Sequence, residues 1–377
     1  MIKKWLNKLI NKFWRKQDKK LNELQSAVEN LEKQLEEQKK KTNNLRNFVK
    51  KELEKRDQWE MRSAEIKFLA KGKKIWVIKC PAPDTADKIL WGPHNFSVAL
   101  KRELEAKGYY VVIDYHNNWA GRIDADYVLV LRGLHTYRPD RRCENCKYIL
   151  WHNCYPDQVT KEEYELYDLV VVNSFSYTKK LEEELSVPVK TLLLCADVTK
   201  FFPREEEIKY DKVFVGNTRK VHRNIVTWCE EHKIPIQVWG RMDGPTGWKN
   251  YVKKDTCIKL ESPMPNDELP NLYRASKIIL NDHFDEMREY GFVNNRVMEA
   301  LSCGRPVLSD YSEEYEELFG DSLVYYYDED DFLKKLKWLE EHLEEQTEKV
   351  LAVWPKLQKE FSFEARVDAL LEMVEEI

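Results

Sequence analysis

The stretch ILNDHFDEMREYGFVNNRVMEALSCGRPVLS, residues 279–309, has the pattern of the end of a strand, a polar loop, a helix and a second strand. Apolar runs predict buried strands over 277–280 and 306–309, and a helix is expected over 295–302, ending at Gly304. Strands that are joined through a helix cross over with a right-handed sense and lie parallel in one sheet. This unit therefore predicts a parallel α/β sheet.

The same alternation continues on both sides of this unit. Short apolar runs alternate with amphipathic helices from about residue 72, and the pattern restarts after a charged run at 204–209. An α/β fold with two doubly wound, Rossmann-like domains is therefore expected, over 72–203 and 204–338, followed by a helical segment over 339–377. The further strands are expected at 74–79, 109–113, 127–131, 148–151, 168–172, 189–194, 212–215 and 236–239, and the further helices at 96–107, 176–185, 224–232 and 267–274.

The composition of the 377 residues, 42% hydrophobic and 34% charged, is typical of a soluble protein with real cores. The net charge of −4 argues against a general nucleic-acid binder, because such proteins carry a basic surplus. The chain has no apolar run of about 18 residues for a transmembrane helix, and no secretory signal is recognised. Eight cysteines are too few for a disulfide scaffold, so a cytoplasmic location is expected.

Residues 1–20 carry seven Lys, one Arg and one Asp, whereas the rest of the chain is acidic. Their apolar residues recur at helical spacing and predict an amphipathic helix with Trp5, Phe13 and Trp14 on one face. A basic helix with an aromatic face favours binding to an anionic membrane surface, here the inner face of the cytoplasmic membrane. Alternatively, this face continues the helix bundle that follows.

A coiled coil is predicted over residues 21–65. Apolar residues from Leu21 to Val49 repeat with the alternating 3-4 spacing of a heptad seam, interrupted by the polar Gln38 and Thr42. Such a seam gains little in an isolated helix, so a homo-oligomer formed through this segment is expected. The alternative is a long helix that packs back on the body.

Polar loops follow the expected strands, where doubly wound sheets bind their ligands. The helix over 295–302 has free backbone N–H groups at its start, which favour an anion near Asn294 and Asn295. Arg296 can add a charge-assisted contact to a phosphate, and Glu299, one turn on, can accept hydrogen bonds from sugar hydroxyls. In the alternative interpretation, Glu299 is a solvated position that pairs with Arg296 along the helix.

Five stretches occur in an order that is typical of one known family. They are WGPHNFSVALKRELEAKGYYV (91–111), YVLVLRGLHTY (127–137), YDLVVVNSFSYTKKL (167–181), KVFVGNTRKVHR (212–223) and MEALSCGRPV (298–307). Together they resemble the bacterial family-1-like group of GT-B glycosyltransferases, which includes spore-maturation-type surface glycosyltransferases. In that group the carboxylate of the last motif contacts the donor, which implies this role for Glu299. Many GT-B enzymes carry a second Glu eight residues earlier, and this chain departs from them with Gly291.

The resemblance implies an enzyme that moves a sugar from a nucleotide sugar to a hydroxyl of a glycan or lipid-linked acceptor, in bacterial surface glycan biosynthesis. The nucleotide sugar is a substrate, so no cofactor is implied, and GT-B chemistry needs no obligatory metal. Catalytic roles are assigned to His94, Arg296 and Glu299, with His94 as the base that takes the acceptor proton, although a lone His is often structural. Contacts to donor or acceptor are expected from Gly216, Asn217, Arg219, Arg223, Gly240, Arg241, Asp282, His283, Asn294, Asn295, Arg132 and His135.

Two further interpretations stay open. The protein can be a non-catalytic scaffold in which the coiled coil is the working part and the double sheet is a relic, and Gly291 favours this alternative.

Cys143, Cys146, His152 and Cys154 offer enough ligand types for a structural zinc, but a single C-x-x-C is weak support. No metal is assigned to these four residues, and the three cysteines are expected to be reduced, partly buried thiols.

Overall fold

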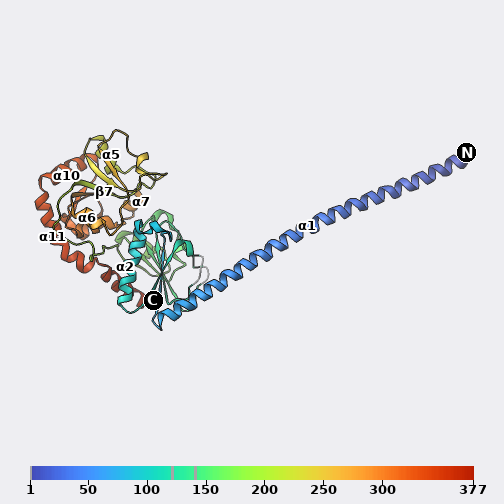
Figure 1. Ribbon diagram of the computed structural model, residues 1–377, viewed down its shortest axis with the longest axis horizontal. Helices are drawn as coiled ribbons and strands as arrows, with labels where there is room; N and C mark the ends of the chain where they lie inside the picture. The colour runs from blue at the N-terminus through green and yellow to red at the C-terminus, as the bar shows by residue number, and fades with distance from the viewer. Residues whose placement is uncertain (1, 120–122, 140–141) are drawn as a thin grey trace. The chain divides into compact units, whose positions relative to one another are not determined.

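The first of two parallel sheets follows a long N-terminal helix in the computed structural model, which describes residues 2–119, 123–139 and 142–377 (Figure 1). Its strands are β1 (Ile75–Cys80), β2 (Tyr110–Tyr115), β3 (Tyr127–Arg132), β4 (Lys147–His152), β5 (Leu169–Val172) and β6 (Val189–Thr191), in the spatial order β2-β1-β3-β4-β5-β6. The connecting helices are α2 (Gly92–Ala106), α3 (Lys161–Tyr164) and α4 (Phe175–Glu184), with 3₁₀ turns at Ala86–Leu90, His116–Asn118 and Pro156–Gln158.

The second sheet also has six parallel strands. They are β7 (Tyr210–Val215), β8 (Ile236–Trp239), β9 (Ile258–Glu261), β10 (Ser276–Asn281), β11 (Val307–Asp310) and β12 (Val324–Tyr326), in the order β12-β11-β10-β7-β8-β9. The helices between them are α5 (Asn224–Glu231), α6 (Leu269–Arg274), α7 (Asp285–Glu289), α8 (Asn295–Ser302) and α9 (Glu313–Phe319), with 3₁₀ turns at Trp248–Asn250 and Gly320–Ser322. The expected α/β class with two doubly wound domains is thereby confirmed.

Two strands of the second sheet were not expected from the sequence. Both β9 and β12 are edge strands, so each pairs along one side only. The four residues of β9 are largely half-exposed or exposed, and β12 has only three residues, so neither contains the continuous apolar run that marks a buried strand.

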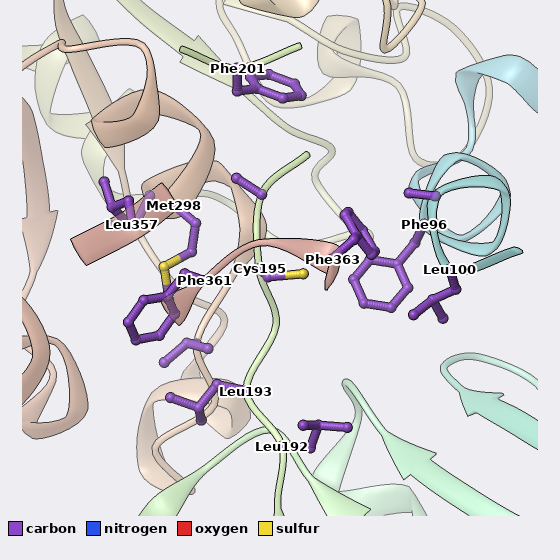
Figure 2. Packing of buried hydrophobic residues seen from close by; sticks show 14 of the residues in the cluster. Phe96, Leu100, Leu192, Leu193, Cys195, Phe201, Met298, Leu357, Phe361 and Phe363 are labelled. Atoms are coloured by element: carbon purple, nitrogen blue, oxygen red, sulfur yellow. The ribbon is translucent and has the colours of Figure 1, made fainter. Parts of the chain in front are cut away.

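The C-terminal segment contacts both domains. It consists of α10 (Glu329–Glu341), α11 (Leu343–Glu360) and α12 (Phe363–Glu375); α11 packs against α8, and α12 packs against α2. Figure 2 shows the junction, where the Phe363 ring meets the Phe96 ring edge-on, with 4.7 Å between their centroids. Cys195, Met298 and residues of both sheets belong to the same buried cluster, so the two domains share one continuous core.

The N-terminal helix, α1 (Ile2–Ala70), runs without a break through the predicted amphipathic and coiled-coil segments (Figure 1). The chain divides into two compact units, Met1–Glu65 and Ile66–Ile377. Within the first unit, the seam side chains are exposed, among them Leu24 and Leu31, and the side chains of Trp5 and Phe13 lie outside the described residues. A coiled coil needs a second helix, so it stays a prediction.

The last turn of α1 belongs to the second unit. Ile66 and Ala70 are buried there, in the same apolar cluster as Ile75 and Val77 of β1. Across residues 2–119, 123–139 and 142–377, no helix combines the length and the hydropathy required to cross a bilayer.

Candidate active site

The candidate site lies where the strand order of the second sheet reverses. β7 and β10 are neighbours in space, but the chain leaves β7 toward β8 and leaves β10 toward β11. The loops after these two strands therefore diverge and open a crevice at the carboxyl edge of the sheet, which is the usual ligand position in doubly wound folds.

Three adjoining hollows occupy this crevice. The outer pocket, about 550 Å³, is lined mainly by the loops after β7, β10 and β12 and by Tyr155, Asp157 and Gln158 of the first domain. The central pocket, about 210 Å³, shares Arg219 with the outer pocket. The small inner pocket shares Asn295 with the central pocket. The shared walls join the three hollows into one cleft between the domains.

The N-terminus of α8 faces this cleft. Asn294 is the N-cap residue, and its Oδ1 accepts a hydrogen bond of 3.2 Å from the Val297 backbone N–H. Asn294 and Asn295 line the central pocket, so the free N–H end of the helix points at the space where a ligand would bind. The Oδ1 atom of Asn295 is buried and has no hydrogen-bond partner among the described residues, which leaves it available to a hydroxyl.

Glu299 lies one turn further along α8 and lines the inner pocket. Its side chain is almost fully buried, so it is not a solvated helix position. Burial raises the pKa of Glu299 to about 8, and Asp197 adds to the shift, while Arg296 and a hydrogen bond with Tyr273 oppose it. In the free protein near neutral pH, this carboxyl is therefore largely protonated.

The inner pocket combines aromatic rings with polar side chains, among them Asn95, Asp197 and Asn266. Its aromatic residues are Phe96, Phe201 and Phe363, and Figure 2 shows the Phe96 ring of α2 next to the Phe363 ring of α12. The burial of Glu299 accounts for most of its high pKa, because the charged form loses its hydration.

Arg296 points away from the pockets and into the second domain. Its guanidinium group donates to the Val215 carbonyl and to Asn281 Oδ1, at the carboxyl ends of β7 and β10, and it lies over the Phe214 ring with 4.7 Å to the centroid. A Cβ atom at Gly216 would lie 2.6 Å from Arg296 Nη2. Gly216 is thus needed for the packing of Arg296, and Arg296 holds the two strand ends together.

A buried polar chain positions the start of α8. Asp310 Oδ1 lies 2.8 Å from His283 Nδ1, and His283 Nε2 lies 3.0 Å from the side-chain nitrogen of Asn294. The tautomer that satisfies both contacts carries its proton on Nδ1. Burial alone would raise the pKa of Asp310, but its interaction with His283, which includes hydrogen bonds from the His283 ring and backbone N–H, lowers it below the ordinary value.

Arg219 occupies the wall between the outer and central pockets. Its guanidinium carbon lies 4.2 Å from the ring centroid of Tyr155 and 4.1 Å from that of Phe284, one ring from each domain. The Nη1 atom of Arg219 also lies 3.5 Å from Oε1 of Glu286. Arg219 and Lys220 both have positive φ angles, which non-glycine residues rarely adopt, so this loop is held in a strained conformation at the domain boundary.

The other predicted residues of the second domain contribute to its framework. Arg223 and Asp282 form a buried ion pair on the wall of the outer pocket. Asn217 Oδ1 accepts a hydrogen bond from the backbone N–H of Arg241. A Cβ atom at Gly240 would lie 2.5 Å from the ring nitrogen of Trp248. Gly240 therefore permits the close packing of the β7 and β8 loops, whereas Asn217 and Arg241 are themselves exposed.

His94 lies near the start of α2, but its ring turns away from the pockets that its neighbours line. The Tyr115 hydroxyl is 2.8 Å from His94 Nδ1. Burial lowers the pKa of His94, and the nearby Lys88 lowers it further, so the ring is neutral at physiological pH.

The remaining predicted residues of the first domain have local partners. Arg132 forms a buried ion pair with Glu163, with 2.6 Å between Nε and Oε1. The His135 ring stacks on the His116 ring at 3.7 Å between centroids. The structure therefore brings Asn294, Asn295, Glu299 and Arg219 to one cleft, and it separates Arg132 and His135 from that cleft.

The cysteine and histidine set does not form a metal centre in the part of the chain that the structure describes, where no group of three or more potential ligands gathers. His152 is fully buried, and its Nδ1 lies 2.7 Å from the Tyr164 hydroxyl. Burial lowers the pKa of His152 to about 3, aided by the charge of Arg132.

Glu314 contacts position 291, and sequence reasoning missed this contact. Its carboxylate fills the space in which a side chain at position 291 would lie, and Gly291 has a φ of +66°. Glu314 Oε1 accepts a hydrogen bond of 2.6 Å from Ser176 Oγ in the first domain. The position where many GT-B enzymes carry a Glu is thus next to a carboxylate from α9, which ties the two domains together. No local pattern signals this, because 23 residues separate Gly291 from Glu314.

Comparison with known proteins agrees with this arrangement. Residues 219–372 match the family model described as "Glycosyl transferase-like", which covers α8 and the loops on both sides of the crevice. No curated protein matches the chain.

Three solved structures with the same fold are sucrose-phosphate synthase from Thermosynechococcus elongatus, the DNA-modifying enzyme β-glucosyltransferase, and T4 phage BGT with its UDP-glucose substrate. The first has a TM-score of 0.62 and 11% identity, and the match covers 81% of this chain and 99% of the synthase. The second has a TM-score of 0.58, 12% identity and coverage of 80% and 99%. The third has a TM-score of 0.55, 12% identity and coverage of 79% and 98%. The body of the chain therefore has the two-domain GT-B fold.

Proposed function

We propose that this protein is a GT-B glycosyltransferase that moves a sugar from a nucleotide-diphosphate sugar to a hydroxyl acceptor. The observation that carries the proposal is the N-terminus of α8, which faces a cleft between two doubly wound domains with Glu299 one turn behind it. The family match over residues 219–372 supports the same reaction class.

The chemistry requires stabilisation of a leaving diphosphate. The acceptor oxygen bonds to the anomeric carbon, the bond from that carbon to the diphosphate oxygen breaks, and its electron pair leaves with the diphosphate. The backbone N–H groups at Asn295 and the guanidinium group of Arg219 are placed to meet the growing negative charge. Because these groups belong to the protein, we expect transfer to proceed without a metal ion.

Glu299 and His94 are assigned the remaining roles. Glu299 lies deep enough in the cleft to hydrogen-bond to the hydroxyls of the donor, as its resemblance to the signature carboxylate implies. The neutral ring of His94 is the proposed base for the acceptor proton, because the residue before it, Pro93, lines the central pocket.

The test combines nucleotide binding with transfer. A thermal-shift series with UDP, GDP, TDP and CMP identifies the base, because a ligand at 100 times its Kd stabilises by about 2.7 kcal/mol. We expect Glu299→Ala and Arg219→Ala to abolish transfer while the circular dichroism stays native. Arg296→Ala should also abolish it, with a lower melting temperature because Arg296 joins two strand ends. Glu348→Ala, an exposed position on α11, is the control. Unchanged turnover in both Glu299→Ala and Arg219→Ala would contradict the assignment.

A non-catalytic scaffold is the second candidate, favoured by the exposed apolar seam of α1 and by the glycine at 291. It predicts no binding of any nucleotide or nucleotide sugar at millimolar concentration in calorimetry. Binding of one of them would reject it.

We further propose that the enzyme acts in surface glycan synthesis at the inner face of the cytoplasmic membrane, as an oligomer. The basic residues of 1–20 support electrostatic attachment to anionic lipid. The expected result is salt-sensitive binding of the full chain to vesicles that contain phosphatidylglycerol. A chain without residues 1–20 should remain unbound, and equal partitioning of the two would reject membrane attachment.

A further inference from the structure

The first domain contributes an aromatic ring to the side chain that is proposed to meet the diphosphate. Tyr155 follows β4, and its ring centroid lies 4.2 Å from the guanidinium carbon of Arg219, a residue of the second domain. Phe284, after β10, presents a second ring to the same group at 4.1 Å. A guanidinium group is attracted to the negative face of an aromatic ring. The position of Arg219 therefore depends on both domains.

The ion pair of Arg219 is weaker than its ring contacts. Arg219 Nη1 lies 3.5 Å from Glu286 Oε1, and the two side chains are 29% and 28% exposed. Such half-exposed pairs contribute little, because water screens the charges. A phosphate oxygen makes a shorter and stronger bond to a guanidinium group, so a bound diphosphate can replace Glu286. The two rings would stay in contact with Arg219 throughout.

The backbone is strained on both sides of the contact between Tyr155 and Arg219. Their φ angles are +60° and +49°, and Lys220 follows with +68°. In the described part of the chain, six residues other than glycine have a positive φ, and these are three of the six. Each costs about 1 kcal/mol or more, and such strain tends to gather at functional sites. Two loops from different domains thus keep an unfavourable conformation at the place where they meet.

A buried ion pair anchors the turn that carries Tyr155. The 3₁₀ turn Pro156–Gln158 begins directly after this residue, and the Gln158 N–H donates to the Tyr155 carbonyl at 3.0 Å. Arg132, which is buried and paired with Glu163, donates to the Gln158 carbonyl at 3.2 Å. The same turn packs against α7 of the second domain. Arg132 therefore supports Tyr155 from inside the first domain, although it lies outside the cleft.

We propose that Tyr155 is a positioning residue of the transferase, whose ring holds the Arg219 guanidinium group at the donor diphosphate. The inference rests on the proposed function, in which Arg219 meets the negative charge that grows on the leaving group. Arg219 lies on the wall shared by the outer and central pockets, and Tyr155 lines the outer pocket beside it. The first domain thereby takes part in binding the diphosphate through Arg219, and only while the two domains are in contact.

The experiment compares a nucleoside monophosphate with the matching diphosphate, for the base that the thermal-shift series identifies. Both are titrated into full-length protein by calorimetry. Tyr155→Asn removes the ring and suits a positive φ. We expect it to weaken diphosphate binding about tenfold and to leave monophosphate binding unchanged, since one contact between a cation and a ring is worth roughly this factor. Tyr155→Phe keeps the ring and should bind both as the wild type does.

A double-mutant cycle tests whether Tyr155 acts through Arg219. In an Arg219→Ala background, Tyr155→Asn should cause no further loss of diphosphate affinity, because no guanidinium group remains to be held. Tyr155→Gly also suits a positive φ and is the second variant without a ring. Tyr110→Leu is the control, since its ring lies 6.0 Å from Lys101 Nζ and outside the three pockets, and it should change neither affinity. Circular dichroism checks the fold of every variant.

The outcomes separate this inference from the proposed function. Wild-type diphosphate affinity in Tyr155→Asn and Tyr155→Gly would overturn the positioning role and leave the transferase intact. Additive losses in the cycle, or equal losses of monophosphate and diphosphate affinity, would overturn it as well, because Tyr155 would then act independently of Arg219. A wild-type protein that binds neither nucleotide would reject the transferase, and the role of Tyr155 with it.

Discussion

Glu299 is the residue whose environment differs most from that of a free carboxyl. Burial and the neighbouring Asp197 disfavour its charge, and they hold its pKa at about 8, against 4.5 for an ordinary Glu. The folded state thus binds a proton that the unfolded state releases above pH 4.5. Stability is therefore lost as the pH rises from about 4.5 to about 8, and the loss stays constant above that.

Glu299→Gln should remove this pH dependence. The amide keeps the shape and stays neutral, so we expect the variant to exceed the wild type in stability by roughly a few kcal/mol at about pH 9 and by much less at about pH 5. Calorimetric melting of both proteins at the two pH values measures the difference. Glu348→Gln is the matched control, and an equal gap between Glu299→Gln and wild type at both pH values would contradict the assigned environment.

Gly291 is constrained by both its backbone angle and its neighbour. Gly291→Ala should destabilise the folded protein by about 2–4 kcal/mol. The alanine must keep a left-handed backbone conformation, and its methyl group collides with the Glu314 carboxylate. Gly244→Ala is the matched control, since Gly244 has a φ of +84° and no atom within 4 Å of its Cβ position. In Gly244→Ala, only the strained backbone conformation lowers the stability, so this variant should lose less stability than Gly291→Ala.

The double variant Gly291→Ala/Glu314→Ala checks the origin of the effect. Removal of the carboxylate relieves the collision, so the double change should cost less free energy of unfolding than the sum of the two single changes. Urea unfolding supplies the four values. Strict additivity would show that Glu314 does not occupy the space beside residue 291.

At the scale of elements, α8 depends on a polar chain from β11 for the position of its first turn. The Asn294 side chain caps the helix through its oxygen, and through its nitrogen it reaches both His283 and Asn281, at 3.0 and 3.1 Å. The Asn294 side chain therefore couples the helix start to the carboxyl end of β10 and, through His283, to Asp310 at the end of β11.

Substitution at Asn294 separates these two duties. Asn294→Ala should cost about 1 kcal/mol for the lost cap, and more for the polar atoms left without a donor. Asn294→Ser keeps a capping oxygen, so it should recover the stability of the cap but not the stability lost at His283 and Asn281. Chemical denaturation gives the stabilities, and nucleotide titration should show weaker binding in both variants. Equal stability of the Ala and Ser variants would argue against the cap.

At the scale of the whole molecule, residues 66–377 form one unit with its own continuous core, while α1 carries an apolar seam that this unit does not explain. The seam side chains Leu24 and Leu31 are 57% and 64% exposed. A second copy of the same helix would cover them through heptad packing.

Leu24→Asp/Leu31→Asp should therefore lower the oligomeric mass in sedimentation. The thermal transition of the body and its nucleotide affinity should stay unchanged, because the two substitutions lie in a different compact unit. Ser26→Asp, on the opposite face of the helix from Leu24, is the control. A chain without residues 1–60 should match the double variant. A wild-type chain that sediments as a monomer would exclude the coiled coil.

Much of this architecture was predictable. The strand–helix alternation predicted ten of the strands, the two-domain fold and the helix over 295–302 at its observed bounds. The strands β9 and β12 were missed, because β9 is largely half-exposed or exposed and β12 has only three residues, so neither shows a continuous apolar run. Periodicity and capping act over a few turns of chain, and a sequence displays them directly.

The sequence alone determined where the crevice opens and which helix begins there. Tertiary structure alone decided that Arg296 turns inward to join two strand ends, and that Glu314 fills the space left by Gly291. It also decided that Glu299 has a pKa near 8. These outcomes depend on distances between groups far apart along the chain, and such distances are set only when both domains close on their shared core.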